Sequence, residues 1–373
     1  MSKPHVLLAA GGTGGHVFPA EALASELMDR GYRLGLVTDI RGQKYGGALG
    51  ELETHHIRAG GIAGKSFSAR IKSVMELGIG TWQARRLLKD LKPDAVVGFG
   101  GYASVPTMMA ATFTNIPTVI HEQNALLGRA NRLLAGRVKG IATSFAQTHG
   151  LPDGVAEKVT LSGMPVRAPI AAKAHAPYPD VAEQAPLGIL VLGGSQGASI
   201  LSDVVPAALA LLPDEIKARL DVTQQCREED LERVQNAYGQ SGIRAHLATF
   251  IDDVPERMVS AHLVISRAGA STVAEALAVG RPSILVPYPY AADDHQTFNA
   301  QAVDAEGAGW IMPQDTFTAE KLAARLDSLL GLPAVLEKAA RCANQLGRSD
   351  AAKHLADMVS NLIGHTKNGS GNA

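Results

Sequence analysis

The sequence predicts an α/β protein with two domains, each built on a parallel β-sheet that helices cover. Three observations lead to this prediction. The length of 373 residues exceeds what one hydrophobic core usually supports. A short apolar run, a glycine-rich turn and an amphipathic helix recur in that order, and the pattern starts again after a proline-rich passage. Hydrophobic content of 46% with 19% charged residues excludes long-range disorder, collagen and a coiled coil.

In the first half of the chain, apolar runs predict the strands and glycines predict the turns. Residues 6–10 are apolar and lead into the glycine-rich residues 11–15, which predicts a strand followed by a tight turn. A helix is expected around residues 20–30, closed by Gly31. Further strands are expected over 34–38, 95–99 and 117–120.

The longest stretch without a charged residue lies between Asp94 and His121, which raises the question of a membrane span. Glycines and prolines such as Gly98, Pro106 and Pro117 interrupt it, so strand, turn, helix and strand is the better interpretation. The N-terminus has no apolar core and no small-residue cleavage site of a signal peptide, so export is not predicted.

A passage rich in prolines separates the two halves and is typical of a hinge or linker. The predicted boundary divides a domain of residues 1–165 from one of residues 166–345. A helix over 346–363 is expected next, able to pack on the second domain or back on the N-terminal one, and then a disordered tail over 364–373. Strands of the second domain are expected over 189–192, 263–266 and 283–286, with a helix after the second of them.

The formal net charge of −1 argues against nucleic acid as a partner. The charges are unevenly distributed, because residues 1–165 hold 18 Lys and Arg against 12 Asp and Glu, a balance of +6, while the remainder holds 17 against 24, a balance of −7. The two cysteines, Cys226 and Cys342, are far apart, so neither a disulfide framework nor a zinc site is predicted. This usage fits a reducing cytoplasm.

The glycine-rich turn 11–15 is the first candidate site. Its glycines let a ligand approach the backbone, and the helix that follows offers N–H groups to an anion. The turn matches neither a Walker A loop nor G-x-G-x-x-G, although Asp39 keeps a nicotinamide enzyme open as an alternative. His16 is a candidate general base; the alternative is a histidine that only caps the helix start.

The second half carries an equivalent turn, 193–197, and a further motif, 267–275, between a strand and a helix. Two such turns predict a ligand bound at the carboxyl ends of the strands. Backbone amides and hydroxyls at 270–272 can hold a diphosphate and Glu275 a ribose diol. Alternatively, Thr272 and Glu275 form a capping box and are structural.

Residues 293–299 place two aspartates beside a histidine, yet neither Asp-x-Asp nor a metal-site histidine pair occurs, so no metal is predicted. Gln296 is favoured as a ligand of sugar hydroxyls, with an ordinary polar loop as the alternative.

Between residues 64 and 92, apolar side chains interleave with seven basic residues against two acidic ones. This pattern fits a helix on an anionic membrane surface, or an ordinary helix with a buried stripe.

Taken together and in this order, the motifs resemble the MurG family, whose members transfer N-acetylglucosamine from UDP-N-acetylglucosamine to the lipid-linked muramyl acceptor of peptidoglycan. The resemblance covers nearly the whole chain. It rests on GGTGGHVFPA, GFGGYAS, HEQN, GMPVR, LGGSQGA, FIDD, SRAGASTVAEAL and DDHQ. The family often has paired glutamines in the last motif, where this chain has His295 before Gln296, so only Gln296 is carried over.

The resemblance implies a GT-B fold and an inverting transfer to the 4-hydroxyl of lipid I that needs no cofactor or metal, with His16 as the base. The acceptor and an anionic membrane surface would meet the N-terminal domain, at the cytoplasmic face of the inner membrane, where other cell-wall synthesis proteins are further expected partners. Expected donor ligands are Thr13, Gly14, Gly15, Asn124, Arg167, Ser195, Ile251, Ala270, Ser271, Thr272, Glu275 and Gln296. Expected acceptor or membrane residues are Gly100, Gly101, Tyr102, Ile71, Lys72 and Trp82.

Three rival functions remain open from the sequence. A UDP-sugar epimerase would convert the donor without an acceptor. A transferase of the same architecture would use a different acceptor. A noncatalytic UDP-sugar sensor would bind the donor and never release UDP.

Overall fold

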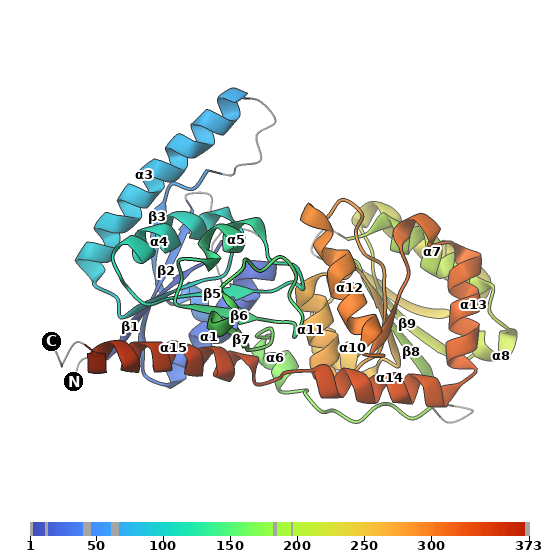
Figure 1. Ribbon diagram of the computed structural model, residues 1–373. Helices are drawn as coiled ribbons and strands as arrows, with labels where there is room; N and C mark the ends of the chain where they lie inside the picture. The colour runs from blue at the N-terminus through green and yellow to red at the C-terminus, as the bar shows by residue number, and fades with distance from the viewer. Residues whose placement is uncertain are drawn as a thin grey trace. The chain divides into compact units, whose positions relative to one another are not determined.

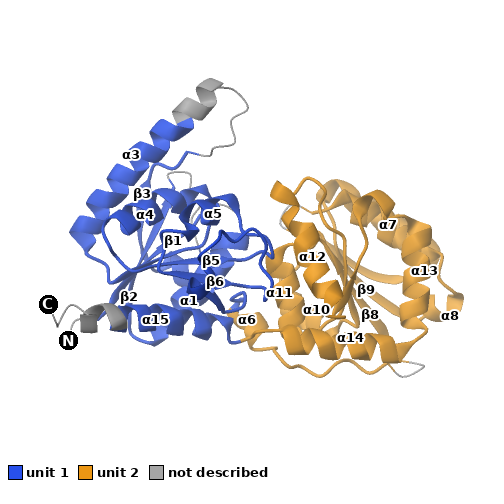
Figure 2. Cartoon of the chain, viewed as in Figure 1, with its two compact units in different colours: residues 1–167, 350–373 blue, residues 168–349 orange. Residues whose placement is uncertain are grey.

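The computed structural model divides into two compact units, residues 1–167 with 350–373 and residues 168–349 (Figure 2). The structure describes residues 3–11, 14–39, 46–60, 67–181, 185–194 and 197–369, and the side chains of 67–72 and 365–369 fall outside this description. Each unit is a parallel sheet with helices packed against it (Figure 1). Within the described ranges, no helix is both long and apolar enough to cross a membrane.

Unit 1 contains a seven-stranded sheet in which all neighbouring strands are parallel, in the order β3-β2-β1-β4-β5-β6-β7. Side chains of the central strand β1 alternate between two apolar clusters: Val6 and Leu8 belong to one, Leu7 and Ala9 to the other. Both faces of the sheet are therefore buried. The strands are β1 (His5–Ala9), β2 (Arg33–Asp39), β3 (Glu53–Ile57), β4 (Ala95–Gly98), β5 (Thr118–Glu122), β6 (Gly140–Thr143) and β7 (Val159–Leu161).

Helices α1 and α15 bury their apolar stripes in the cluster on one face of this sheet, and α3, α4 and α5 contribute to the cluster on the other. The uncharged stretch between Asp94 and His121 is β4, α4 and β5, as the sequence predicts. The helices of unit 1 are α1 (Gly14–Asp29), α2 (Gly47–Gly50), α3 (Phe67–Leu91), α4 (Gly101–Phe113), α5 (Arg129–Ala135), the 3-10 turn η1 (Ala156–Lys158) and α15 (Ala351–Gly369).

Helix α15 follows unit 2 in the chain and packs in unit 1. Arg30 Nη1 donates to Asp357 at 2.6 Å, and the Tyr32 hydroxyl donates to Ser360 at 2.8 Å. The helix differs from the expected helix 346–363 and disordered tail from 364, because it begins at Ala351 and continues to Gly369. The preceding helix α14 reaches Leu346 and ends there, where the backbone of the next residue becomes extended. Buried residues of α15 at 355, 356, 359 and 363 recur at helical spacing.

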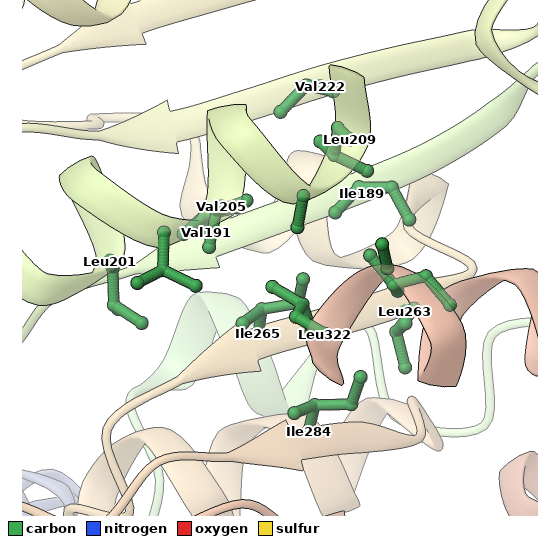
Figure 3. Packing of buried hydrophobic residues seen from close by; sticks show 14 of the residues in the cluster. Ile189, Val191, Leu201, Val205, Leu209, Val222, Leu263, Ile265, Ile284 and Leu322 are labelled. Atoms are coloured by element: carbon green, nitrogen blue, oxygen red, sulfur yellow. The ribbon is translucent and has the colours of Figure 1, made fainter. Parts of the chain in front are cut away.

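Unit 2 contains a six-stranded parallel sheet in the order β10-β9-β8-β11-β12-β13. One face carries an apolar core in which Ile189 and Val191 of β8 pack with Ile265 and with Leu322 of α13 (Figure 3). The strands are β8 (Leu187–Leu192), β9 (Leu220–Gln225), β10 (Arg244–Ala248), β11 (Leu263–Ser266), β12 (Ser283–Leu285) and β13 (Gly309–Ile311).

Most helices of unit 2 lie between successive strands, as parallel pairing requires, and the others precede the first strand or follow the last. They are α6 (Ala168–Ala171), α7 (Ser199–Ala210), α8 (Asp214–Lys217), α9 (Leu231–Ser241), α10 (Val254–Ser260), α11 (Ala270–Val279), α12 (His295–Ala305), α13 (Ala319–Leu330) and α14 (Pro333–Leu346), with the 3-10 turns η2 (Glu228–Asp230), η3 (Ala292–Asp294) and η4 (Gln314–Thr316).

Part of the proline-rich passage is fixed to unit 2 by one buried arginine. Arg281 is 1% exposed and donates from Nη2 to the carbonyl oxygen of Pro177 at 2.9 Å and from Nε to that of Met258 at 3.0 Å. Its guanidinium also lies over the Tyr178 ring. Burial lowers the pKa of Arg281 to about 10, so the side chain remains charged at pH 7. The chain around Pro177 is therefore held by unit 2, and the interpretation of the passage as a hinge or linker stays a prediction.

Candidate functional site

Each sheet has one point where the strand order reverses, between β1 and β4 in unit 1 and between β8 and β11 in unit 2. Ligands of open α/β sheets bind outside the carboxyl ends of the strands at this point. The glycine-rich turns 11–15 and 193–197 follow β1 and β8, and the motif 267–275 follows β11. These three motifs thus follow strands that adjoin the two reversal points.

His16 lies in the first turn of α1 beside the turn that follows β4. Its Nδ1 is 3.2 Å from Oε1 of Gln123. Gly100 and Gly101 have φ of 80° and 69°, a conformation that favours glycine. A Cβ on either would lie 3.4 Å or 3.3 Å from the imidazole. Gly100 and Gly101 therefore adjoin the imidazole of the candidate base. Gly14 and Gly15 precede His16 in α1, and Tyr102 follows Gly101 in α4.

The polar residues at the end of β5 were not all recognised from the sequence. His121 is fully buried and donates from Nε2 to the carbonyl oxygen of Gly163 at 3.0 Å. Burial lowers the pKa of His121 to about 4, so its ring is neutral at pH 7. The signal that was available is a run of four polar residues, HEQN, which begins in the last two residues of the buried strand β5.

Glu122, at 1% exposure, organises the loop that carries Asn124. Its carboxylate accepts from the backbone N–H of Asn124 at 3.0 Å, from that of Gly128 at 2.9 Å and from Nδ2 of Asn131 at 2.8 Å. Such charge-assisted hydrogen bonds fix a loop more strongly than neutral ones. The position of Asn124 is therefore set by a buried carboxylate.

Arg167 lies against the first helix of unit 1, with its guanidinium 5.2 Å from the centre of the Phe18 ring. Burial raises the pKa of Glu21, and the charge of Arg167 opposes this rise. Thr13, expected in the same turn as Gly14, lies outside the described residues. Arg167 is thus a cation that unit 1 holds near the start of α1.

In unit 2, α11 begins at Ala270 with Gly269 as its N-cap. Thr272 is the third residue of the helix, so the capping-box interpretation of Thr272 and Glu275 is wrong. The backbone N–H groups of the first turn have no acceptor within the helix. Ser271 Oγ is buried, and no hydrogen-bond partner for it occurs in the described part of the chain. Glu275 is 6% exposed one turn further on.

Arg267, which the sequence did not single out, anchors the segment before α11. Its Nη1 donates to the carbonyl oxygen of Val286 at 3.2 Å and its Nη2 to Oε1 of Gln314 at 2.6 Å. Burial lowers the pKa of Arg267. Asn299 of α12 donates to the carbonyl oxygen of Ala268 at 3.0 Å. These contacts hold the turn that presents the start of α11.

Gln296 lies in the first turn of α12, and its Oε1 accepts from the backbone N–H of Tyr288 at 3.0 Å. The NH2 group of the same amide then points away from the Tyr288 N–H and can donate to another group. Asp293 and Asp294 precede it with φ of 53° and 57°, a strained conformation for aspartate that often marks functional sites. Ile251, expected at uracil, is buried in the loop after β10. Ser195 lies outside the described residues.

Helix α3 has a buried apolar stripe and, on another side, exposed apolar residues; its binding to a membrane surface stays a prediction. Ala84 and Leu88 are buried in the core of unit 1. On the exposed side, Met75, Ile79 and Trp82 are 62%, 39% and 64% exposed and are spaced as neighbours along a helix. The side chains of residues 71 and 72, expected at the membrane, lie outside the described residues. Among described residues, no group of three His, Cys, Asp or Glu is placed to hold a metal ion.

Comparison with known proteins identifies the family. The glycosyltransferase family 28 N-terminal domain matches residues 6–143, and the family 28 C-terminal domain matches residues 188–355. The UDP-N-acetylglucosamine–N-acetylmuramyl-(pentapeptide) pyrophosphoryl-undecaprenol N-acetylglucosamine transferase of Paramagnetospirillum magneticum is 60% identical, over 97% of each chain. That of Rhodospirillum rubrum is 54% identical, over 97% of this chain and 92% of its own.

Among solved structures, MurG of Acinetobacter baumannii has a TM-score of 0.80 and 32% identity, covering 96% of this chain and 99% of its own. The chain belongs to the MurG family. Members of the MurG family have the GT-B fold, and the two parallel-sheet units described above are its two Rossmann-like domains.

Proposed function

We propose that this protein transfers N-acetylglucosamine from UDP-N-acetylglucosamine to lipid I and forms lipid II in peptidoglycan synthesis. The observation that carries the proposal is the placement of His16 and of the start of α11 at the reversal points of the two sheets, in a chain 60% identical to a named transferase. A glycosyl transfer needs both a base and a diphosphate cradle.

Unit 2 would hold the donor. The N–H groups of Ala270, Ser271 and Thr272 carry the partial positive charge of a helix N-terminus, which favours the diphosphate. The buried Ser271 hydroxyl would donate to the same group. Glu275 would accept from the ribose hydroxyls and the Gln296 amide would donate to the sugar.

The remaining expected donor ligands have separate roles in this proposal. The backbone of Ile251 would meet uracil, and Ser195 would contact the donor phosphates. In unit 1, Thr13, Gly14, Gly15 and Asn124 would contact phosphate and sugar, and Arg167 would add positive charge for the leaving diphosphate.

Unit 1 would supply the base. His16 would remove the proton of the acceptor 4-hydroxyl as its oxygen attacks the anomeric carbon of the α-linked donor, and UDP would leave with the bonding electron pair. The product then has a β linkage. The charge that develops on UDP would be met by backbone N–H groups and by Arg167 without a metal ion.

The acceptor lipid implies that unit 1 meets the membrane. Residues 1–165 are basic, with 18 Lys and Arg against 12 Asp and Glu. Helix α3 exposes the apolar side chains of Met75, Ile79 and Trp82, and the exposed Arg85 and Arg86 follow them in the same helix. Apolar side chains with basic neighbours bind anionic bilayer surfaces. We therefore place the protein peripherally at the cytoplasmic face of the inner membrane, where other cell-wall synthesis proteins are expected partners. Gly100, Gly101 and Tyr102 would contact the acceptor.

The first test measures UDP release from UDP-N-acetylglucosamine in EDTA, with and without a short-chain lipid I analogue. Release that requires the acceptor supports a metal-free transfer. Conversion of the donor without acceptor would favour an epimerase. Donor binding without release in either case would contradict transfer to this acceptor and favour a sensor or a different acceptor.

A further inference from the structure

Two buried polar side chains of unit 1 connect to the candidate base. Nδ1 of His16 lies 3.2 Å from Oε1 of Gln123, and Nε2 of Gln123 lies 3.1 Å from Nδ1 of His121. Gln123 and His121 are 2% and 0% exposed. A neutral imidazole accepts a proton only at the nitrogen that lacks one, so these contacts bear on which nitrogen of His16 is basic.

Backbone carbonyl groups fix the orientation of the Gln123 amide. Its Nε2 lies 3.0 Å from the carbonyl oxygen of Phe99 and 3.0 Å from that of His121. Carbonyl oxygens only accept hydrogen bonds, so the group that faces both must be the NH2 group. The flipped amide would place its own oxygen against two others. The amide oxygen of Gln123 therefore faces His16.

His121 favours the same orientation. Its Nε2 lies 3.0 Å from the carbonyl oxygen of Gly163, so this nitrogen carries the ring proton. Burial keeps the ring neutral, with a pKa of about 4. Nδ1 of His121 consequently accepts from the NH2 group of Gln123. A protonated ring would instead place two donors against each other.

We propose that Gln123 is a positioning residue that holds His16 in the Nδ1–H tautomer, so that Nε2 is the basic nitrogen of the transfer reaction. An amide oxygen accepts only, so His16 must donate to it from Nδ1, and Nε2 then carries the lone pair. Gly101 adjoins that edge of the ring, because a Cβ there would lie 3.5 Å from Nε2. The proposal rests on the proposed role of His16 as the base.

The tautomer is measured without substrate, by ¹⁵N–¹H correlation of the histidine side chains at pH 8. The His16 signals are assigned by their loss in His16→Ala and are expected to show a protonated Nδ1 and an unprotonated Nε2. Gln123→Met keeps the length of the side chain and removes both amide groups, so it is expected to shift His16 toward the Nε2–H tautomer. Gln123→Glu keeps an acceptor oxygen and is expected to preserve Nδ1–H.

The matched control is Gln83→Met. The Gln83 amide oxygen accepts from the backbone N–H of Arg58 at 3.0 Å, so the control also removes one glutamine side-chain hydrogen bond of unit 1, here an exposed one. It is expected to leave the His16 signals unchanged. An Nε2–H tautomer in the wild type, or Nδ1–H persisting in Gln123→Met, would overturn the positioning role.

Turnover then separates this proposal from the proposed function. With donor and lipid I analogue, Gln123→Met is expected to lower kcat by about 10-fold to 100-fold, with the donor KM within about twofold. This loss is smaller than the roughly 10²–10⁴-fold that a general base contributes, because His16 itself remains. A merely structural role predicts that kcat falls only together with the thermal stability of the variant. That result would contradict the proposal. If wild type shows the expected tautomer and transfers no sugar, the proposed function fails while the tautomer assignment stands.

Discussion

At the scale of single residues, His121 makes the stability of unit 1 depend on pH. Burial lowers the pKa of His121 from 6.5 to about 4. Between these values the unfolded chain binds more protons than the folded chain, so stability is highest above pH 6.5 and falls as the pH falls toward 4. The pKa values of His5 and His262 are also lowered by burial and act in the same direction.

We therefore expect the titration of His121 to lower the free energy of unfolding by about 2 kcal/mol when the pH falls from 7.5 to 5. The measurement is urea unfolding of wild type and His121→Gln at both pH values. The variant removes the titrating ring, so its loss of stability over this interval should be smaller by that amount. Equal losses in the two proteins would show that His121 titrates normally.

The sequence predicted the place of His16 and Gly100 because glycine-rich turns after apolar strands are local patterns. It did not predict the contacts of Gln123, since His16 and Gln123 lie 107 positions apart and only the sheet order brings the ends of β1 and β5 to the same edge. Arg267 begins the motif 267–275, but its contacts were not predicted for the same reason, because its partner Gln314 comes from a distant turn.

At the scale of elements, the start of α11 gives a direct test of donor binding. We expect Glu275→Gln to weaken UDP binding by about 10-fold to 100-fold, the worth of a hydrogen bond to a charged group, as measured by isothermal titration calorimetry. The control is Glu256→Gln on α10, which loses an exposed ion pair with Lys173 and should bind UDP as wild type does. Lower thermal stability of Glu275→Gln with unchanged UDP affinity would show a purely structural role.

Helix α3 gives a test of membrane binding. Replacing Met75 and Trp82 by serine removes apolar surface from its exposed side, and we expect binding to anionic vesicles to fall by about 10-fold or more, since burying one such side chain is worth about 1.5–3 kcal/mol. The measurement is vesicle co-sedimentation. The control is Leu211→Ser in unit 2, which changes a side chain of similar exposure, 58%. Equal losses in both proteins would contradict a specific role of α3.

Elements were predictable where the residue pattern was strong. The runs at 6–10, 95–99 and 263–266 are apolar because both faces of a parallel sheet are covered, and β1, β4 and β11 follow them closely. The strand β3, with the sequence ETHHI, was not predicted, because it lies at the edge of the sheet and carries polar, partly exposed side chains. An edge strand of this kind has no apolar run from which it can be predicted.

At the scale of the whole molecule, the chain returns to unit 1 after completing unit 2. Which sheet a terminal helix covers depends on complementary surfaces rather than on sequence distance, so the pattern of α15 alone left either domain open as its partner. The contacts of Asp357 with Arg30 and of Ser360 with Tyr32 belong to unit 1. The stability of unit 1 should consequently depend on residues that follow unit 2 in the sequence.

This dependence predicts that replacing two buried leucines destabilises different units. Leu355→Ala removes part of the unit 1 core and Leu322→Ala part of the unit 2 core, where both side chains are 0% exposed, and each should cost about 2–5 kcal/mol. Hydrogen exchange should accelerate in β1 and β4 for Leu355→Ala and in β8 and β11 for Leu322→Ala. Because the proposed diphosphate and ribose ligands of α11 lie in unit 2, UDP binding should weaken more in Leu322→Ala than in Leu355→Ala. Faster exchange in β8 caused by Leu355→Ala would contradict the assignment of α15 to the core of unit 1.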